Sequence, residues 1–357
     1  WQQVKDKLYV EDLNGVQWDY YRTTYEKFLP YINNGFDFSE MLSELLGELN
    51  VSHTGSTYWG NGYTLSTACL GLFFDPAYEG DGLKVQEVLR RGPFDVRNTK
   101  VKAGDIIEAI DGEKIEAGKD YNAMLDGKVG RPVRVMLKGG REVVVKPISS
   151  GEQSKLLYRR WVDRNKAMVD KWSNGQIAYV HVKAMDSESF RTVFSELLSD
   201  SNRQKKAVIV DERHNGGGWL HDDLCTLLSG RQYQSFVPRG QFIGWDPWNK
   251  WVKPSCVLVC EDDYSNGHGF PYVYQKLGIG PVIGAPVAGT MTAVWWETML
   301  DGQTVFGIPQ VGCLGMDGKY GENQTLIPDI TVYNTPEQQL SGDDQQLRRA
   351  VEEMLKK

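Results

Sequence analysis

Cysteine is scarce in this sequence, with five copies scattered along 357 residues. That number and spacing exclude the disulfide scaffold of a small secreted domain. Cys256 and Cys260 fall on the same face of one apolar run, yet they lie too far apart to form a disulfide easily. We therefore expect buried free thiols, and cysteine usage leaves the cellular compartment open.

Long apolar runs and a stripe of Lys and Arg are also missing. No run approaches the ~20 apolar residues that span a bilayer, so we expect no membrane span. The net charge is −7, and the densest basic cluster, at 159–164, is typical of a solvated helix face, so we expect no nucleic-acid partner. The chain starts at Trp1 rather than Met, so we expect a processed or trimmed piece of a longer protein.

Helical periodicity is present in the first part of the chain. Apolar residues recur at three- and four-residue spacings in 23–32 and 38–49, which predicts two helices. Asp37 or Ser39 is expected to cap the second helix. The polar, glycine-rich stretch 50–62 is expected to form a loop.

From about residue 65 to 148 the pattern changes to short strands with glycine turns and one short helix at 119–124. Two of its segments, CLGLFFD and KAGDIIEAIDGEKI, resemble the carboxylate-binding loop and the GD-x-I-x-x-I-(N/D)-G run of a PDZ domain. The resemblance implies a groove that adds a peptide as an extra strand, with Leu70, Gly71 and Leu72 capturing a C-terminal carboxylate. A structural β module without a ligand is the alternative.

Beyond residue 150 a helix at 153–172 is followed by alternating strands and helices. Continuous apolar strands in such an alternation predict a buried, largely parallel α/β sheet, which binds ligands at the carboxyl ends of its strands. Two glycine-bearing loops, 211–219 and 261–269, follow two of these strands. The predicted strands are 175–182, 205–212, 255–261, 280–286 and 304–309.

The first of these loops carries the run NGGG at 215–218. Three glycines permit a close backbone approach, so that N–H groups can point at an anion. The run matches neither GxxxxGK[ST] nor GxGxxG, and a set of backbone donors for a developing oxyanion suits it better. A simple glycine loop is the alternative.

The second loop carries Ser265 in the sequence Tyr-Ser-Asn-Gly. This is half of the nucleophile elbow GxSxG, because Asp263 replaces the first glycine. The position after a buried strand and before a helix favours a nucleophile, and there the N–H of Asn266 would face an oxyanion.

A serine nucleophile needs a base, and the sequence has five histidines. The spacing of His214 and His221 is no recognised zinc pattern, so we predict no metal site. His268 follows Ser265 by three residues and is expected to point its ring away from it. His53, in the loop 50–62, would alone pass as a surface histidine.

Six segments in order resemble tricorn-type serine peptidases of the tail-specific protease family, and together they cover nearly the whole chain. Five are NVSHT, DERHNGGGW, DDYSNGHGF, LGIGPVIGAPVAGT and YGENQTLIPDI, and the sixth is the PDZ-like segment. The resemblance implies a helical cap at 1–62 with the Ser-His loop, a PDZ domain at 63–149 and a crotonase-like (ClpP-like) α/β catalytic core at 150–357.

The resemblance also implies the roles of individual residues. Ser265 would be the nucleophile and His53 its general base, with Glu322 orienting the imidazole through Ser52. The oxyanion donors would be the N–H groups of Gly218 and Asn266, with Gly217 and His268 beside the substrate.

Three departures from the family pattern qualify these roles. The segment Gly284–Thr290 has no lysine, which disfavours the Ser–Lys dyad of other tail-specific proteases. His268 stands where the family has an acid, and Gln234–Phe236 replaces its acidic selector of basic side chains.

We therefore predict a serine peptidase without a cofactor that cleaves peptides or unfolded chain ends through an acyl-enzyme. An inactive peptide- or ligand-binding protein on the same scaffold is the alternative. An acyl-CoA enzyme of the crotonase type is disfavoured by the PDZ insertion. We expect a periplasmic or secreted protein, with a cytoplasmic location and a homo-oligomer left open.

Overall fold

The computed structural model describes residues 1–60 and 66–357. The chain divides into two compact units, one formed by Trp1–Asn61 with Asn165–Lys357 and the other by Gly62–Arg164. The domain boundary expected at 62/63 lies outside the described residues. The boundary expected at 149/150 coincides with the start of helix α4 (Ser150–Trp172), which continues past the division at Asn165.

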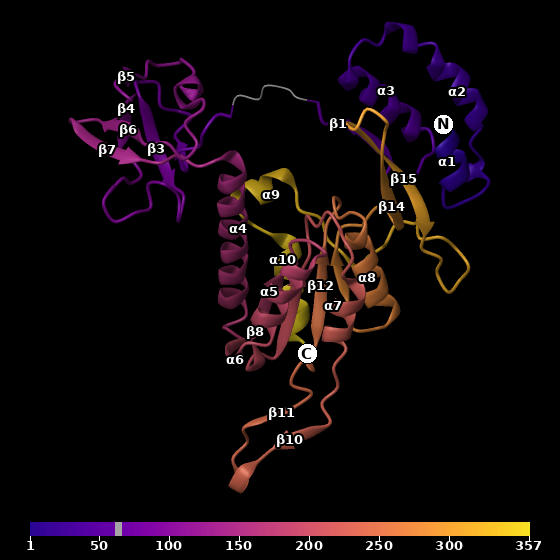
Figure 1. The fold of residues 1–357 in the computed structure, drawn as a ribbon. Coiled ribbons are helices and arrows are strands. Elements are labelled where there is room, and N and C mark those ends of the chain that lie inside the picture. Colours follow the sequence, from indigo (N-terminus) through magenta and orange to yellow (C-terminus); the bar gives the residue numbers. More distant parts are fainter. Residues whose placement is uncertain (61–65) are drawn as a thin grey trace. The chain divides into compact units, whose positions relative to one another are not determined.

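A five-stranded sheet forms the centre of the larger unit, in the order β16-β13-β12-β9-β8 (Figure 1). Every neighbouring pair is parallel, as the continuous apolar strands predicted. All of the residues in the three strands β8, β9 and β12 are buried. The strands are β8 (Ile177–His181), β9 (Ala207–Asp211), β12 (Ser255–Val259), β13 (Val282–Gly284) and β16 (Ile330–Thr331).

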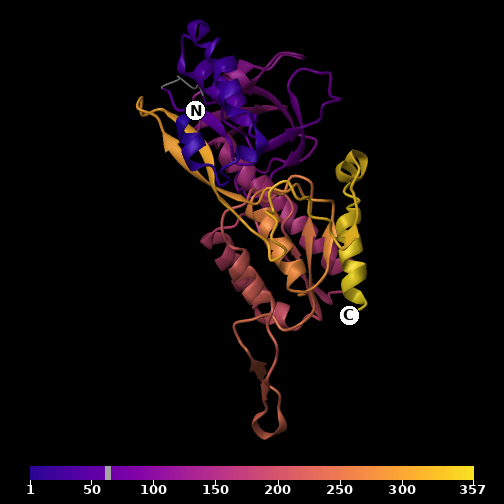
Figure 2. The same ribbon diagram turned by 90° about the vertical axis from the view of Figure 1, so that its right-hand side faces the viewer.

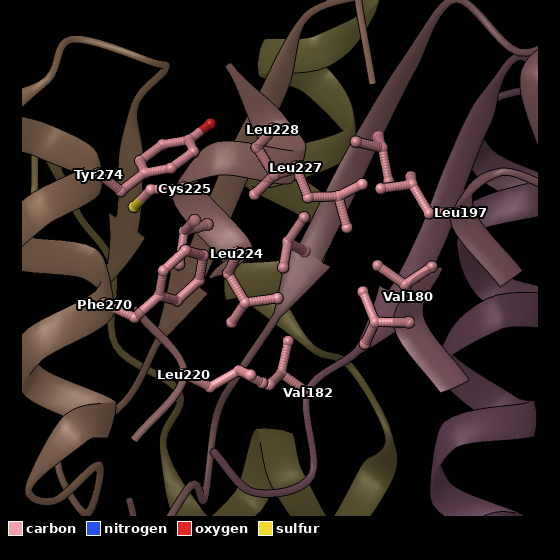
Figure 3. Packing of buried hydrophobic residues seen from close by; sticks show 14 of the residues in the cluster. Val180, Val182, Leu197, Leu220, Leu224, Cys225, Leu227, Leu228, Phe270 and Tyr274 are labelled. Carbon is pink, nitrogen blue, oxygen red and sulfur yellow. The ribbon is translucent and has the colours of Figure 1, made fainter. Parts of the chain in front are cut away.

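Helices cover both faces of this sheet, and alternate strand residues serve each face. Val208 and Val210 of β9 belong to the main hydrophobic core. This core also contains Leu197 of α5, Leu224 of α7 and Phe270 of α8, which Figure 3 labels. Helix α10 packs on the other face against β8, β9, β12 and β13, and Figure 2 shows it in yellow. The helices are α5 (Ser187–Leu197), α6 (Asp200–Arg203), α7 (His221–Leu228), α8 (Asn266–Lys276), α9 (Pro336–Ser341) and α10 (Gln345–Leu355).

The strand expected at 304–309 does not belong to this sheet. It is β15 (Thr304–Gly312), which pairs antiparallel with β14 (Thr292–Thr298) and β1 (Gly55–Tyr58). Its Ile308 is fully buried among apolar residues of the N-terminal helices. The prediction was wrong because an apolar run shows that a strand is buried but not which sheet buries it.

The N-terminal region contains helices, with three corrections to the expected elements. The helix expected at 23–32 is instead the end of α2, which stops at Glu26, followed by a 3₁₀ turn that contains Pro30. Asn34, and neither Asp37 nor Ser39, caps α3, because its side chain accepts a hydrogen bond from the N–H of Asp37. Part of the predicted loop 50–62 is strand β1, which begins two residues after His53. The helices are α1 (Gln2–Lys7), α2 (Trp18–Glu26) and α3 (Gly35–Gly47), with short 3₁₀ turns at Leu13–Gly15 and Leu29–Tyr31.

The smaller unit has its own sheet, in the order β2-β3-β4-β6-β7, with β5 paired to β4. Its own hydrophobic core includes Leu70, Leu72 and Ile107. The short helix expected at 119–124 is a 3₁₀ turn at Asn122–Leu125. The strands are β2 (Leu72–Phe74), β3 (Leu83–Val88), β4 (Ile106–Ile110), β5 (Glu113–Lys114), β6 (Val133–Leu137) and β7 (Arg141–Val145).

A hairpin that the sequence pattern did not predict extends from the larger unit (Figure 1). It consists of β10 (Gln234–Phe236) and β11 (Gly244–Asp246), which pair antiparallel. All residues of β10 are exposed. Among the described helices, none is both long and apolar enough to cross a bilayer.

Candidate active site

Ser265 lies in a strained turn between β12 and α8. Its backbone has φ 58° and ψ −121°, a region that residues other than glycine rarely occupy. Two hydrogen bonds hold the turn: the Ser265 N–H donates to Thr290 Oγ1 (2.8 Å), and the Tyr264 N–H donates to the Asn215 carbonyl (2.9 Å). This is the strand–turn–helix geometry of a nucleophile elbow, although GxSxG is incomplete.

Asp263, where that motif has glycine, connects the two glycine-bearing loops. Its carboxyl oxygens accept hydrogen bonds from the N–H groups of Asn215 (3.1 Å) and Cys260 (2.8 Å). Burial raises the pKa of Asp263 to about 8, although these hydrogen bonds act in the opposite direction. The side chain therefore stabilises the position of the NGGG loop relative to Ser265.

Glycine is required at positions 217 and 218 because other backbone atoms approach too closely. A Cβ on Gly217 would lie 2.5 Å from Ser265 Cβ, and one on Gly218 would lie 2.2 Å from the Met185 carbonyl oxygen. Both glycines also have positive φ, +97° and +133°. The NGGG loop is therefore packed directly against the turn that carries Ser265.

Two backbone N–H groups, one in the NGGG loop and one directly after Ser265, have no protein acceptor among the described residues. Within the part of the chain that the structure describes, neither the N–H of Gly218 nor that of Asn266 donates to a protein acceptor. Asn266 is the first residue of α8, where the helix dipole also favours negative charge. These groups fit the expected oxyanion donors.

The Asn266 side chain also makes hydrogen bonds that the sequence did not predict. Its Oδ1 accepts hydrogen bonds from the N–H groups of Leu220 (2.7 Å) and His221 (3.0 Å) at the start of α7. Its Nδ2 donates to His221 Nδ1 (2.8 Å). The side chain thereby joins the start of α7 to the start of α8.

Glu322, Ser52 and His53 form a continuous hydrogen-bonded series. The Ser52 N–H and hydroxyl both donate to the Glu322 carboxylate, at 2.6 and 2.9 Å. Because that hydroxyl proton is committed, the Ser52 oxygen accepts from His53 Nδ1–H at 2.8 Å. The opposite nitrogen of the imidazole, Nε2, is left as the proton acceptor.

Thr292, which the sequence did not indicate, belongs to the same series. Its Oγ1 lies 3.0 Å from both His53 Nδ1 and Ser52 Oγ, and its side chain also bonds Glu322. Burial raises the pKa of Glu322, and the bonds from Ser52 and Thr292 oppose that shift. Burial lowers the pKa of His53, which keeps its imidazole neutral and able to accept a proton.

Tyr264, next to Ser265, connects this series to the turn between β12 and α8. The His53 N–H donates to Tyr264 Oη (2.6 Å), and the two rings lie 4.8 Å apart. Among the described residues no hydrogen bond joins the His53 ring to the Ser265 hydroxyl, and such bonds are often long before a substrate binds. Residues more than 200 positions apart thus meet at one site.

His268 is buried and contacts Thr290, the residue whose hydroxyl bonds the Ser265 N–H. Its side chain is 1% exposed, and its Nδ1 accepts a hydrogen bond from the N–H of Thr290 (3.3 Å). Burial lowers the pKa of His268 to about 4, so the ring is neutral. The expected substrate contact does not fit this burial, whereas a role in positioning Thr290, and through it Ser265, does.

The residues of the PDZ-like loop belong to the other unit. The side chains of Leu70 and Leu72 are buried in that unit's core, and Gly71 has φ +67°. The N–H groups of Leu70 and Gly71 are not used by a protein acceptor among the described residues.

Three family models match successive parts of the chain. They describe the Tricorn protease C1 domain (residues 1–47), the Tricorn protease PDZ domain (76–150) and Peptidase family S41 (176–332). The chain belongs to the tricorn-type S41 peptidases. The expectation drawn from the six ordered segments is thus confirmed, and the S41 match contains both glycine-bearing loops and Glu322.

Individual tricorn relatives agree with the family models. The chain is 28% identical over 365 residues to Tricorn protease homolog 1 of Streptomyces coelicolor, covering 98% of this chain and 34% of the relative. It is 26% identical over 356 residues to Tricorn protease of Thermoplasma acidophilum, covering 93% and 32%. The crystal structure of the tricorn protease shares the fold, with a TM-score of 0.88 at 23% identity, covering 100% of this chain and 36% of that one. The chain thus spans about a third of the length of these relatives.

Proposed function

We propose that the chain is the catalytic part of a serine peptidase that hydrolyses peptides or unfolded chain ends, with a histidine base. The observation that carries the proposal is the series Glu322–Ser52–His53, which reaches Tyr264 beside the strained Ser265 turn. A serine in that turn, a neutral imidazole and two available N–H donors are the parts that acyl transfer requires.

In this mechanism Ser265 Oγ attacks the substrate carbonyl while its proton passes to His53 Nε2, which is worth about 10²–10⁴-fold in rate. The negative charge on the carbonyl oxygen is met by the N–H groups of Gly218 and Asn266, at about 3 kcal/mol per donor. His53 then gives the proton to the leaving amine as the C–N bond breaks. A water molecule, deprotonated by His53, hydrolyses the acyl-enzyme and frees Ser265.

A Ser–Lys dyad is less well supported. The segment Gly284–Thr290, where such relatives carry their lysine, contains none in this chain. Thr290 at its end instead accepts a hydrogen bond from the Ser265 N–H. The segment therefore supports the nucleophile's backbone, and proton transfer falls to His53.

The finer features of fold, partners and location are proposals as well. The parallel core sheet supports a crotonase-like description of the core, and the donors of Leu70 and Gly71 support capture of a C-terminal carboxylate. We keep a homo-oligomer and a periplasmic or secreted location as proposals. Sedimentation of the purified protein and fractionation of the producing cells test the last two.

Labelling with a fluorophosphonate, followed by mass mapping of the modified peptide, tests the catalytic proposal. We expect the label on Ser265, and we expect Ser265→Ala to lose both the label and peptide hydrolysis. Ser201→Ala, which removes an exposed hydroxyl from α6, is the matched control and should retain both.

Full hydrolysis by Ser265→Ala would overturn the peptidase mechanism. A wild-type protein that binds peptides but takes no label and cleaves nothing would instead support the inactive binding protein. The two candidate functions are thus separated by one set of measurements.

A further inference from the structure

A second group of chemically active side chains lies on the two glycine-bearing loops, and the proposed reaction does not use it. We propose that His214, Cys260 and Asp262 form a binding site for a zinc ion. One ligand atom from each residue lies within 4.8 Å of the others. His214 Nδ1 is 3.0 Å from both carboxylate oxygens of Asp262, and Cys260 Sγ is 2.8 Å from Asp262 Oδ1 and 3.8 Å from His214 Nδ1.

These separations are close to those of a metal site. Zinc bonds of about 2.0–2.3 Å to nitrogen, oxygen and sulfur place the ligand atoms of a tetrahedral site roughly 3–4 Å from one another. The sulfur–oxygen distance is the shortest because the thiol donates a hydrogen bond to the Asp262 carboxylate. When an ion binds, that proton leaves to solvent, and the sulfur and oxygen move apart by a few tenths of an ångström to bind the metal.

The kinds of ligand atom select the class of ion. A thiolate and an imidazole favour zinc over magnesium or calcium, which prefer oxygen ligands. One nitrogen, one sulfur and one carboxylate oxygen supply three of the four positions of a tetrahedral zinc ion. The fourth position is left for a water molecule or another solvent-borne ligand.

The backbone arranges this cluster before any ion arrives. Strands β9 and β12 are parallel neighbours, so their carboxyl ends place His214 and Cys260 side by side. The His214 N–H donates to Cys260 Sγ (3.1 Å), and His214 has a positive φ of 68°. Cys260 is 4% exposed, whereas the side chains of His214 and Asp262 are 56% and 64% exposed, which leaves the cluster open to solvent on their side.

The position of the site indicates what the ion would do. His214 directly precedes the NGGG loop, and Asp262 lies three residues before Ser265. The ion would therefore join the loop of the oxyanion donor Gly218 to the loop of the nucleophile, in addition to the bonds of Asp263. Only this consequence rests on the proposed peptidase function, because binding itself does not require catalysis.

Metal binding to the whole chelator-treated chain tests the site. We expect Zn²⁺ to bind one-to-one by titration calorimetry, and Co²⁺ to give a thiolate-to-cobalt charge-transfer band. His214→Ala and Cys260→Ser should each weaken Zn²⁺ binding by more than about 100-fold, because loss of a direct ligand exceeds the 10–100-fold cost of losing an outer partner. Cys260→Ser should also remove the band.

Matched variants separate ligand loss from general damage. Glu261→Gln changes the exposed carboxylate next to the cluster, and Cys69→Ser removes a thiol from the other unit, so both should bind Zn²⁺ as the wild type does. Asp262→Asn removes an exposed ligand without disturbing the interior, so it serves if Cys260→Ser fails to fold. An absence of saturable Zn²⁺ binding, or unchanged binding in His214→Ala and Asp262→Asn, would overturn the proposal. Neither result depends on whether the protein hydrolyses peptides.

Discussion

Glu322 does not touch the imidazole that it is proposed to orient, because the Ser52 hydroxyl lies between them. Glu322→Gln preserves the shape of the side chain but removes the charge that fixes the direction of the Ser52 hydroxyl. His53 then loses its preferred tautomer, so we expect kcat to fall by roughly 10²-fold or more with little change in KM. Steady-state kinetics on a peptide substrate measures this effect.

The control for that change is Glu352→Gln, which neutralises an exposed carboxylate on α10 and should keep wild-type kinetics. If Glu322→Gln were as active as this control, the orienting role of Glu322 would be refuted. A rise in KM alone would point to substrate binding and also contradict it.

Two glycines of the NGGG loop, Gly216 and Gly218, differ in the space available for a side chain. A Cβ on Gly218 meets the Met185 carbonyl at 2.2 Å, whereas a Cβ on Gly216 has nothing within 4 Å. Gly218→Ala must shift the loop and its oxyanion donor, so we expect kcat to fall by about 10²–10³-fold together with a loss of stability. Gly216→Ala should be tolerated.

Kinetics and thermal melting of the two variants measure the difference. Equal losses in both would show that the loop tolerates no side chain anywhere, and the specific packing of Gly218 against Met185 would then not explain them. If Gly218→Ala kept the wild-type kcat, the proposal that the Gly218 N–H binds the oxyanion would be refuted.

For the whole molecule, the buried His268 links folding to pH. Its pKa in the folded state is about 4, below the ordinary value of about 6.5, so the folded protein prefers the neutral ring. Above pH ~6.5 both states are neutral and this contribution is complete. Between pH ~6.5 and 4 only the unfolded chain takes up the proton, so the free energy of unfolding falls as pH decreases, by up to about 3 kcal/mol.

Denaturant unfolding across this pH range, with His268→Gln as the comparison, checks this linkage. The variant cannot titrate at this position, so its free energy of unfolding should depend less steeply on pH. Parallel pH profiles for wild type and variant would mean that other groups cause the dependence.

The smaller unit contains the loop that is proposed to bind the C-terminal carboxylate of a peptide. If the N–H groups of Leu70 and Gly71 bind a carboxylate, a peptide with a free C-terminus should bind more tightly than its amidated twin. Calorimetric titration of both peptides into Ser265→Ala, which does not consume them, gives the comparison. Equal affinities would contradict carboxylate capture.

Much of the fold could be predicted from local pattern. Three buried strands, β8, β9 and β12, were expected from continuous apolar runs, because complete burial demands such runs whatever the surrounding fold. The sequence also predicted a turn at Ser265 and a close backbone approach at the glycine run. A serine between a strand and a helix, and a run of glycines, each imply a particular backbone geometry. In the same way, the order of short motifs indicated the family.

Which distant residues meet depends on how the elements pack, and local pattern did not show it. Four features depend on segments that are far apart in the chain. They are the sheet to which β15 belongs, the burial of His268, the hydrogen bonds of Thr292 and the cluster around Cys260. Periodicity reports which face of an element is buried, but it does not report the partner against which that face packs. Local pattern thus indicated most of the core strands and the turn that carries Ser265, whereas packing sets the surroundings that orient, bury or pair each reactive side chain.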